Sequence, residues 1–345
     1  MKWLIFFIAL PFSVSAQGFA NLGSNADGFA VPEPGNEFTF PRDHGPHPNF
    51  RIEWWYLTAN LSAADGTPYG LQWTLFRSAL APIEKEGLES PQFWMGHAAV
   101  TSQGEHFFSE RLARGGIGQA GVETDGGFDA WIDEWYMRGG TDFNALALYA
   151  AGSEFSFDMD LLAKGPLVLQ GNSGYSVKSE EGQASYYYSQ PFFDITGVLS
   201  LPDGEVAVSG EAWLDREWSS QPLASDQSGW DWFSLAFDDG SRMMGFVLRS
   251  QTDAPFTSAT WIDPNGHSEP MPNSAFQARA MANTNVAGRS IPTTWELKLP
   301  QKNVDVTVRA LNPQTWMNTS VPYWEGPIVI TGTHGGRGYL EMTGY

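Results

Sequence analysis

Residues 52–78, IEWWYLTANLSAADGTPYGLQWTLFRS, carry the pattern that decides the fold of this chain. Two segments, Ile52 to Leu61 and Tyr69 to Phe76, have the period-two character of β-strands. The pair Asp65-Gly66 lies between them, and Asp-Gly is a typical hairpin turn. The stretch therefore predicts a β-hairpin that opens with aromatic residues and ends at Arg77.

The same pattern returns in the second half of the chain. Trp232-Phe233 leads to Asp239-Gly240 and then to Arg249, as Trp55-Tyr56 leads to Arg77 in the first hairpin. An internal repeat of this kind predicts two related domains. Because aromatic hairpins are common in all-β proteins, a chance likeness stays open as the alternative.

The segment Ser219 to Ser228 is rich in Ser, Pro and Asp and has no periodicity, which is typical of a linker. We place the restart of the pattern near Ser225 and divide the chain into an amino-terminal domain, residues 17–222, and a carboxy-terminal domain, residues 223–345. A length of 345 residues suits two domains of roughly 150 residues each.

Period-two segments separated by Gly, Asp and Asn turns recur along the whole chain, and this favours a sandwich or barrel over alternating helices and strands. The most helix-like stretch is Pro272 to Ala287, where one short helix is expected. The sequence therefore predicts an all-β protein with few helices. Further predicted strands are Glu154 to Leu161, Val206 to Leu214, Met243 to Arg249 and Val304 to Leu311.

The composition excludes several classes of protein. The chain has no cysteine, so it is neither a disulfide scaffold nor a holder of cysteine-ligated metal. A net charge of −20 argues against binding to nucleic acid or anionic membranes, which need clustered Lys and Arg. Aromatic residues make up 14% of the chain and include 15 Trp, which predicts β-rich domains or a roomy apolar cavity.

The amino terminus has the pattern of a secretory signal peptide. Lys2 precedes the apolar run Trp3 to Phe12, and the small residues Ser13 to Ala16 follow, which predicts cleavage after Ala16. A buried amino-terminal strand is the alternative. The apolar run is too short to span a bilayer, and no later stretch is long enough, so we predict no transmembrane segment in the mature chain. A secreted chain without cysteine fits a bacterial periplasm, and the predicted location is periplasmic or secreted.

Several long motifs carry a family resemblance. They are FPRDHGPHPNFRIEWWYLTANL (40–61), GEAWLDREWSSQPL (210–223), GWDWFSLAFDDG (229–240), the stretch 292–300, and the closing segments YWEGPIVITG and GYLEMTGY. The chain resembles the secreted family of AttH proteins and carotenoid 1,2-hydratases, also called hydroxyneurosporene synthases, over nearly its whole mature length. The resemblance implies two lipocalin-like (calycin-type) antiparallel β-barrels packed together, with an apolar cavity in or between them.

The strand ending in Asp215 and Glu217 offers a candidate proton donor. Alternation places Trp213 and Asp215 on one face and Ala212 and Leu214 on the packing face. A carboxyl beside Trp in an enclosed apolar site has a raised pKa and can donate a proton, as the hydration of an alkene requires. The resemblance implies that Asp215 is this acid. An ion pair of Asp215 with Arg216, or with another basic side chain at a domain junction, is the structural alternative.

The resemblance also implies a His and a Trp, two residues apart, on a neighbouring strand. The matching positions are Tyr186 and Tyr188, so this sequence departs from the hydratase pattern. A tyrosine hydroxyl is a poor base at neutral pH, although it can place a water by hydrogen bonding. The predicted catalytic residues are Asp215 and Tyr186, and Trp213 and Tyr188 are predicted to contact the ligand.

Glu53 stands beside three aromatic residues in the strongest motif. Alternation places it with Trp55 on one face, against Trp54 and Tyr56 on the other. A buried acid needs a partner, so Glu53 is expected to pair with one of three arginines. This structural pair is favoured, and Glu53 and Trp55 are also carried as candidate ligand-binding residues. The three arginines are Arg42, Arg51 and Arg77.

No cofactor or metal site is predicted. His44 and His47, with Asp43, lie in a Gly/Pro-rich loop, but two histidines without a further ligand nearby are a weak metal signal. The other four histidines, His97, His106, His267 and His334, are scattered along the chain. A G-x-S-x-G nucleophile elbow, a Walker loop and a G-x-G-x-x-G fingerprint are all missing from the sequence, so a serine hydrolase is not predicted.

Three functional hypotheses remain. The first is a lipocalin-like protein that binds a hydrophobic ligand, an isoprenoid or acyl lipid, in an aromatic-lined pocket. The second is a hydro-lyase that adds water to an isoprenoid double bond with Asp215 as the acid. The third is an accessory subunit of an ABC-type exporter, because AttH-type members are associated with transport systems.

Overall fold

The computed structural model describes residues 26–221, 223–224 and 226–345. No α-helix occurs in these ranges, where the helical turns are the 3₁₀ segments η2 (Arg42–His44), η3 (Gly87–Glu89) and η4 (Pro300–Lys302). Accordingly, none of the described segments is a helix with the length and apolar character needed to cross a bilayer. The predicted signal peptide, residues 1–16, lies outside the described residues.

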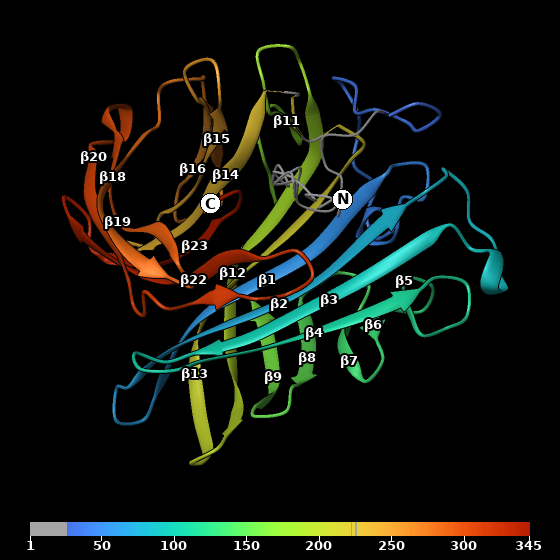
Figure 1. Ribbon diagram of the computed structural model, residues 1–345, viewed down its shortest axis with the longest axis horizontal. Helices are drawn as coiled ribbons and strands as arrows, with labels where there is room; N and C mark the ends of the chain where they lie inside the picture. Colours follow the sequence, from blue (N-terminus) through green and yellow to red (C-terminus); the bar gives the residue numbers. More distant parts are fainter. Residues whose placement is uncertain (1–25, 222, 225) are drawn as a thin grey trace, which may run out of the picture.

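The first sheet has the strand order β4-β3-β2-β1-β13-β12-β9-β8-β7-β6-β5, with β10 and β11 paired to β12. Contacts of β6 with β2, β3 and β4 bring its two ends together and nearly close a barrel (Figure 1). Its strands are β1 (Ile52–Ala63), β2 (Pro68–Ala79), β3 (Gln92–Thr101), β4 (His106–Arg114), β5 (Ala120–Glu123), β6 (Phe128–Ile132), β7 (Trp135–Gly139), β8 (Ala145–Ala151), β9 (Ser156–Ala163), β10 (Val168–Leu169), β11 (Tyr175–Val177), β12 (Ala184–Leu201) and β13 (Gly204–Ser219).

The second sheet is a half-barrel with the order β17-β16-β15-β14-β23-β22-β20-β19-β18, and β21 pairs with β22. The chain passes from the first sheet to the second between Ser219 and Gln227, an interval that contains the predicted boundary. The strands are β14 (Gln227–Phe237), β15 (Arg242–Ser250), β16 (Phe256–Ile262), β17 (Ser268–Met271), β18 (Gln277–Val286), β19 (Arg289–Leu299), β20 (Val304–Ala310), β21 (Trp316–Met317), β22 (Tyr323–Gly332) and β23 (Gly336–Met342).

The predicted all-β architecture of two lipocalin-like barrels is confirmed, and each segment predicted as a strand overlaps one. The prediction of a helix over Pro272 to Ala287 is wrong, because Gln277–Val286 forms β18, which pairs with β19 along its length. Most β18 side chains are exposed, and Asn and Thr at 283–285 are weak helix formers. Backbone pairing with β19 therefore decides the conformation of this segment.

The two aromatic motifs form equivalent hairpins. Antiparallel pairing joins β1 to β2 and β14 to β15, as the internal repeat predicted. The likeness extends to an ion pair with a buried acid. Arg77 on β2 contacts Glu53 on β1, and Arg249 on β15 lies 2.5 Å from Asp231 on β14. Both hairpins thus hold an acid of the first strand against an arginine near the end of the second.

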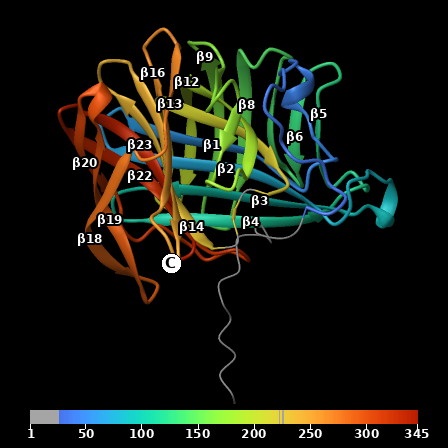
Figure 2. The same cartoon turned by 90° about the horizontal axis from the view of Figure 1, so that it is seen from above.

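The two sheets lie side by side (Figure 2). Each barrel has its own apolar core, and a third apolar cluster lies where the outer faces of the two sheets meet. Tyr187 and Trp213 of the first sheet pack there against Trp232 and Phe246 of the second. At Gly70 on β2 a Cβ atom would come within 2.5 Å of a ring carbon of Pro327 on β22, so the approach of the two sheets requires glycine.

Candidate functional site

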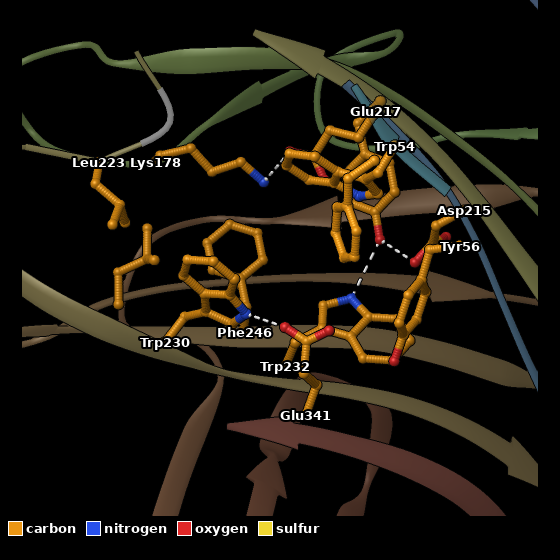
Figure 3. Close-up of a pocket in the computed structure, with 13 residues that line it drawn as sticks. Trp54, Tyr56, Lys178, Asp215, Glu217, Leu223, Trp230, Trp232, Phe246 and Glu341 are labelled. Atoms are coloured by element: carbon orange, nitrogen blue, oxygen red, sulfur yellow. Dashed lines mark hydrogen bonds and ion pairs between the residues drawn. The ribbon is translucent and has the colours of Figure 1, made fainter. Parts of the chain in front are cut away.

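A pocket lies between the two sheets. Its volume is about 660 Å³, including the open space at its edge. Seven aromatic side chains, three carboxylates, one lysine and two leucines form its wall, which is therefore mostly apolar with a few charged groups. The residues are Trp54, Tyr56, Phe76, Lys178, Tyr187, Asp215, Glu217, Leu223, Trp230, Trp232, Phe246, Leu248 and Glu341 (Figure 3).

Strand alternation explains which side chains reach this pocket. On β1, Trp54 and Tyr56 face the second sheet, whereas Trp55 points into the first barrel. In the register of β1 and β13, Glu217 lies opposite Trp54, and Asp215 lies opposite Tyr56. The first sheet thus contributes one continuous patch of alternating aromatic and acidic side chains.

Asp215 is 2% exposed and accepts three hydrogen bonds. Trp213 Nε1 and Ser189 Oγ donate to Oδ1 at 2.6 and 2.5 Å, and the Tyr187 hydroxyl donates to Oδ2 at 2.7 Å. Burial raises the pKa of Asp215 to about 7, against the lowering effect of these three donors. The carboxyl can therefore hold a proton at neutral pH.

The ion pair between Asp215 and Arg216 that the sequence left open does not form. Arg216 lies on the opposite face of β13, inside the first barrel, where it contacts Glu53 and donates to the Gly45 carbonyl. Ala212 and Leu214 pack in the core of that barrel, as predicted for the packing face. The structure therefore has Asp215 on one face of β13 and Ala212 and Leu214 on the other, as the alternation predicted.

Tyr186 and Tyr188 do not share the Asp215 pocket, which corrects their predicted placement. The Tyr186 hydroxyl accepts from the Glu33 backbone N–H at 2.9 Å, and the Tyr188 hydroxyl lies 2.7 Å from His44 Nδ1. Both pack with Trp218 in a separate aromatic cluster. Tyr187, between them in sequence, is the tyrosine that reaches Asp215.

A β-bulge in β12 is the physical reason for this difference. The pairing of β12 with β13 shifts between Gln190 and Phe193, where the two residues Pro191 and Phe192 oppose the single residue Trp213, so β12 has one extra residue. Odd-numbered Phe193 and Ile195 point into the first barrel, yet odd-numbered Tyr187 points outward. A shift of this kind exchanges the two faces of a strand. Its signal in the sequence is Pro191, because proline inside a sheet is confined to edges and bulges.

Glu341 supplies a second carboxyl from the other sheet. It lies on β23 opposite Trp232 on β14, and Trp230 Nε1 donates to its Oε1 at 2.6 Å. Figure 3 shows Glu341 beside Trp230 and Trp232 on the side of the pocket away from Glu217. Burial raises the pKa of Glu341 to about 7, and the negative charge of Asp215 adds to the effect. Two carboxyls with near-neutral pKa values therefore line one pocket.

Lys178 and Glu217 form an ion pair at the edge of the pocket. Lys178 Nζ lies 2.8 Å from Glu217 Oε1, and both side chains are less than one-tenth exposed. The ammonium also lies 4.3 Å from the ring centroid of Phe246 and 5.1 Å from that of Tyr187. The ion pair therefore holds the Lys178 ammonium against aromatic rings. Because Lys178 is the one basic residue among the described residues that line the pocket and it pairs with Glu217, Asp215 and Glu341 have no basic partner there.

Glu53 and Trp55 lie inside the first barrel, away from the pocket, and this corrects their candidacy as ligand contacts. Arg77, one of the three predicted partners, contacts Glu53, and Arg216 is a second partner that the sequence did not suggest. Although burial acts to raise it, these two guanidinium groups hold the pKa of Glu53 well below its ordinary value. Trp55 packs under Arg216, 3.8 Å from the guanidinium carbon to the ring centroid.

In the described part of the chain, no group of three or more potential ligands is arranged to hold a metal ion. His44 stacks on Phe143 with 3.6 Å between ring centroids, and His47 stacks on Trp218 at 3.9 Å. His47 also hydrogen-bonds Glu53. The two histidines therefore take part in packing at one end of the first barrel.

Fold and pocket together define a class: a two-barrel, lipocalin-like protein with an acidic, aromatic pocket between its barrels. The chain belongs to the AttH-like family, which matches residues 31–345. A provisionally named AttH protein from Nitrosomonas europaea is 31% identical, with a TM-score of 0.82 over 92% of this chain and 100% of that one. The predicted resemblance to AttH proteins is thus confirmed.

More distant structures share the fold alone. Kievitone hydratase from Nectria haematococca is 14% identical, with a TM-score of 0.69 over 91% of this chain and 95% of that one. CghA, solved with Sch210972, is 12% identical, with a TM-score of 0.55 over 93% of this chain and 97% of that one. Curated proteins give no match to this chain.

Proposed function

We propose that the pocket between the barrels binds a hydrophobic molecule of the isoprenoid or acyl class and adds water to one of its carbon–carbon double bonds. The observation that carries the proposal is Asp215, a buried carboxyl with a pKa raised to about 7 in an aromatic pocket. A carboxylic acid kept protonated at neutral pH is the group that can protonate an alkene.

The proposed reaction uses both carboxyls. The O–H bond of Asp215 breaks as a C–H bond forms at the less substituted alkene carbon, which leaves a cation at the more substituted one. The aromatic faces of Trp54, Trp232 and Phe246 stabilise this cation by cation–π attraction. Water forms the new C–O bond and gives a proton to Glu341. Asp215 ends ionised and Glu341 ends protonated.

Tyr187 is the proposed positioning residue for the acid. Its hydroxyl donates to Asp215 Oδ2 and accepts from Trp232 Nε1 at 3.2 Å, so it links the acid of one sheet to an aromatic side chain of the other.

Support from the relatives is limited to the fold. Kievitone hydratase is named as a hydratase and has the same two-barrel architecture at 14% identity.

The predicted location and macromolecular partner stay predictions. A cleaved secretory signal and a periplasmic or secreted location belong to this proposal, whereas an accessory role for an ABC-type exporter is the alternative to hydration. Permease and ATPase genes beside the gene for this protein would favour the exporter role, whereas carotenoid genes would favour hydration.

The test compares Asp215→Asn with wild-type protein, using farnesol as the isoprenoid probe in heavy-oxygen water. We expect wild-type protein to incorporate the heavy oxygen, and Asp215→Asn to lose about 100-fold or more of the rate while binding farnesol with unchanged affinity. Asp203→Asn, at an exposed turn, is the matched control. Equal turnover by Asp215→Asn and wild type would refute the role of Asp215. Tight binding without turnover by wild type would leave a lipid-binding protein.

A further inference from the structure

Two buried ionisable residues lie behind the pocket and have no part in the proposed reaction. Glu325 on β22 is 2% exposed, and His97 on β3 has no exposed surface. The two belong to different sheets, so they meet only because the barrels pack together. Buried groups of this kind are costly unless they are paired or have a function.

On its pocket side, Glu325 is next to the proposed base. In the register of β22 and β23, Glu325 lies directly opposite Glu341. The hydroxyl of Tyr56, which lines the pocket, donates to Glu325 Oε1 at 2.5 Å. Glu325 is therefore one step behind the pocket wall.

On its other side, Glu325 is linked to the surface of the protein. The hydroxyl of Tyr323 approaches its carboxyl and lies 2.9 Å from His97 Nδ1. His97 Nε2 lies 3.2 Å from Glu110 Oε1, and the Glu110 side chain is 22% exposed. The hydroxyl of Ser320 donates to Glu110 Oε2 at 2.8 Å. A line of polar groups thus runs from the pocket to solvent across the interface of the two sheets.

The charge state suits proton transfer along this line. Burial raises the pKa of Glu325 well above its ordinary value, and the charge of Glu341 raises it further. The other titratable groups facing it are the hydroxyls of Tyr56, Tyr323 and Tyr339. Burial and the neighbouring charge thus favour the protonated form of Glu325, and among the described residues its Oε2 is buried without a hydrogen-bond partner.

We infer that Glu325, Tyr323, His97 and Glu110 form a proton route that connects Glu341 in the pocket with solvent. Glu341 passes a proton to Glu325, whose own proton moves to the Tyr323 oxygen. Tyr323 gives its proton to His97 Nδ1, and His97 gives the Nε2 proton to Glu110. One proton enters and one leaves, and the return of His97 to the Nε2–H tautomer resets the line.

The route is a property of the protein without substrate. Its use in turnover rests on the proposed function, in which Glu341 gains a proton in every cycle and must lose it. The test therefore measures proton exchange and needs no substrate, so the absence of hydration would leave its result unaffected.

The experiment follows hydrogen–deuterium exchange of the Glu325 carboxyl by stopped-flow infrared spectroscopy. It uses full-length protein with Tyr56→Phe and Glu341→Gln, which remove the acids on the pocket side. In this background we expect His97→Phe to slow the exchange at least tenfold. The control is His44→Phe, because His44 is a buried histidine off the route that stacks between Phe40 and Phe143. Exchange as fast in His97→Phe as in His44→Phe, with both folded by circular dichroism, overturns the route.

A second variant keeps the test valid if His97→Phe does not fold. Glu110→Gln removes the proton acceptor at the surface end, where a polar replacement is tolerated. Severalfold slower exchange in Glu110→Gln supports the route. An unchanged rate shows that Glu325 exchanges by another path and contradicts the inference.

Discussion

Glu325 and Glu341 lie directly opposite each other on β22 and β23, both buried at the interface of the two barrels. Like charges at directly opposed positions destabilise a sheet, and burial in an apolar layer adds to the cost. The pair is stable at neutral pH only if it holds at least one proton. Such an arrangement lowers the stability of the fold, and this indicates a functional role for the interface.

The stability of the protein should depend on the ionisation of Glu341. Its pKa is about 7 in the folded protein, above the ordinary 4.5, so the folded state binds more protons than the unfolded chain between these values. Wild-type stability should fall as pH rises from 4.5 and level off above 7. Relative to wild type, Glu341→Gln should gain about 2 to 3 kcal/mol in unfolding free energy between about pH 5 and about pH 8. Urea denaturation measures it.

The control for this measurement is Glu205→Gln, because Glu205 is exposed at the start of β13. Its unfolding free energy relative to wild type should not change with pH. If Glu341→Gln behaved in the same way, Glu341 would not be the buried carboxyl with a raised pKa described above.

The rate of hydration should have a narrow, bell-shaped dependence on pH. Asp215 must be protonated and Glu341 ionised, and burial raises both pKa values to about 7. Activity should therefore peak near neutral pH, with apparent pKa values that belong to the pair. Initial rates of farnesol hydration from about pH 5 to about pH 9 check this. Glu341→Gln should lose the decline on the acid side, and a profile with an unchanged acid limb would exclude Glu341 as the base.

Tyr187, and neither of its neighbours, should affect turnover. Tyr187→Phe removes the donor to Asp215 Oδ2, so we expect a loss of about tenfold in rate with little change in farnesol affinity. Tyr186→Phe and Tyr188→Phe change side chains on the other face of β12 and should keep the wild-type rate. Steady-state kinetics of the three variants shows whether Tyr187, as in the structure, or Tyr186, as predicted from the sequence, acts at the site. A loss confined to Tyr186→Phe would favour the family-based assignment.

Glu53 should matter for stability. Glu53→Gln leaves the buried guanidinium groups of Arg77 and Arg216 without their counter-ion, and breaking a buried pair costs about 3 to 5 kcal/mol. The matched control is Glu211→Gln, whose side chain is 58% exposed beside Arg242 and should cost at most about 1 kcal/mol. Urea unfolding measures both. Similar small losses would show that Glu53 is not the central counter-ion of this cluster.

A good part of the fold follows from local sequence pattern. The Asp-Gly turn, the alternation of β1 and β13 and the echo in β14 and β15 are short-range signals, and the structure has all of them. The outward face of Asp215 follows from alternation, because Ala212 and Leu214 fill the core. The failed helix at Gln277–Val286 shows the limit, since pairing with β19 overrides a weak local preference.

The site itself depends on contacts between distant segments. Alternation in GYLEMTGY places Glu341 on the face of the strand away from the core residues Leu340 and Met342. Only the packing of the two sheets shows that this outer face is covered and lines the pocket. The bulge in β12 selects Tyr187. The sequence by itself determined the strands and their faces, because side-chain period is a local property of the backbone. The tertiary structure decided which faces enclose a pocket, because register and the contact of two outer faces depend on residues far apart in the chain.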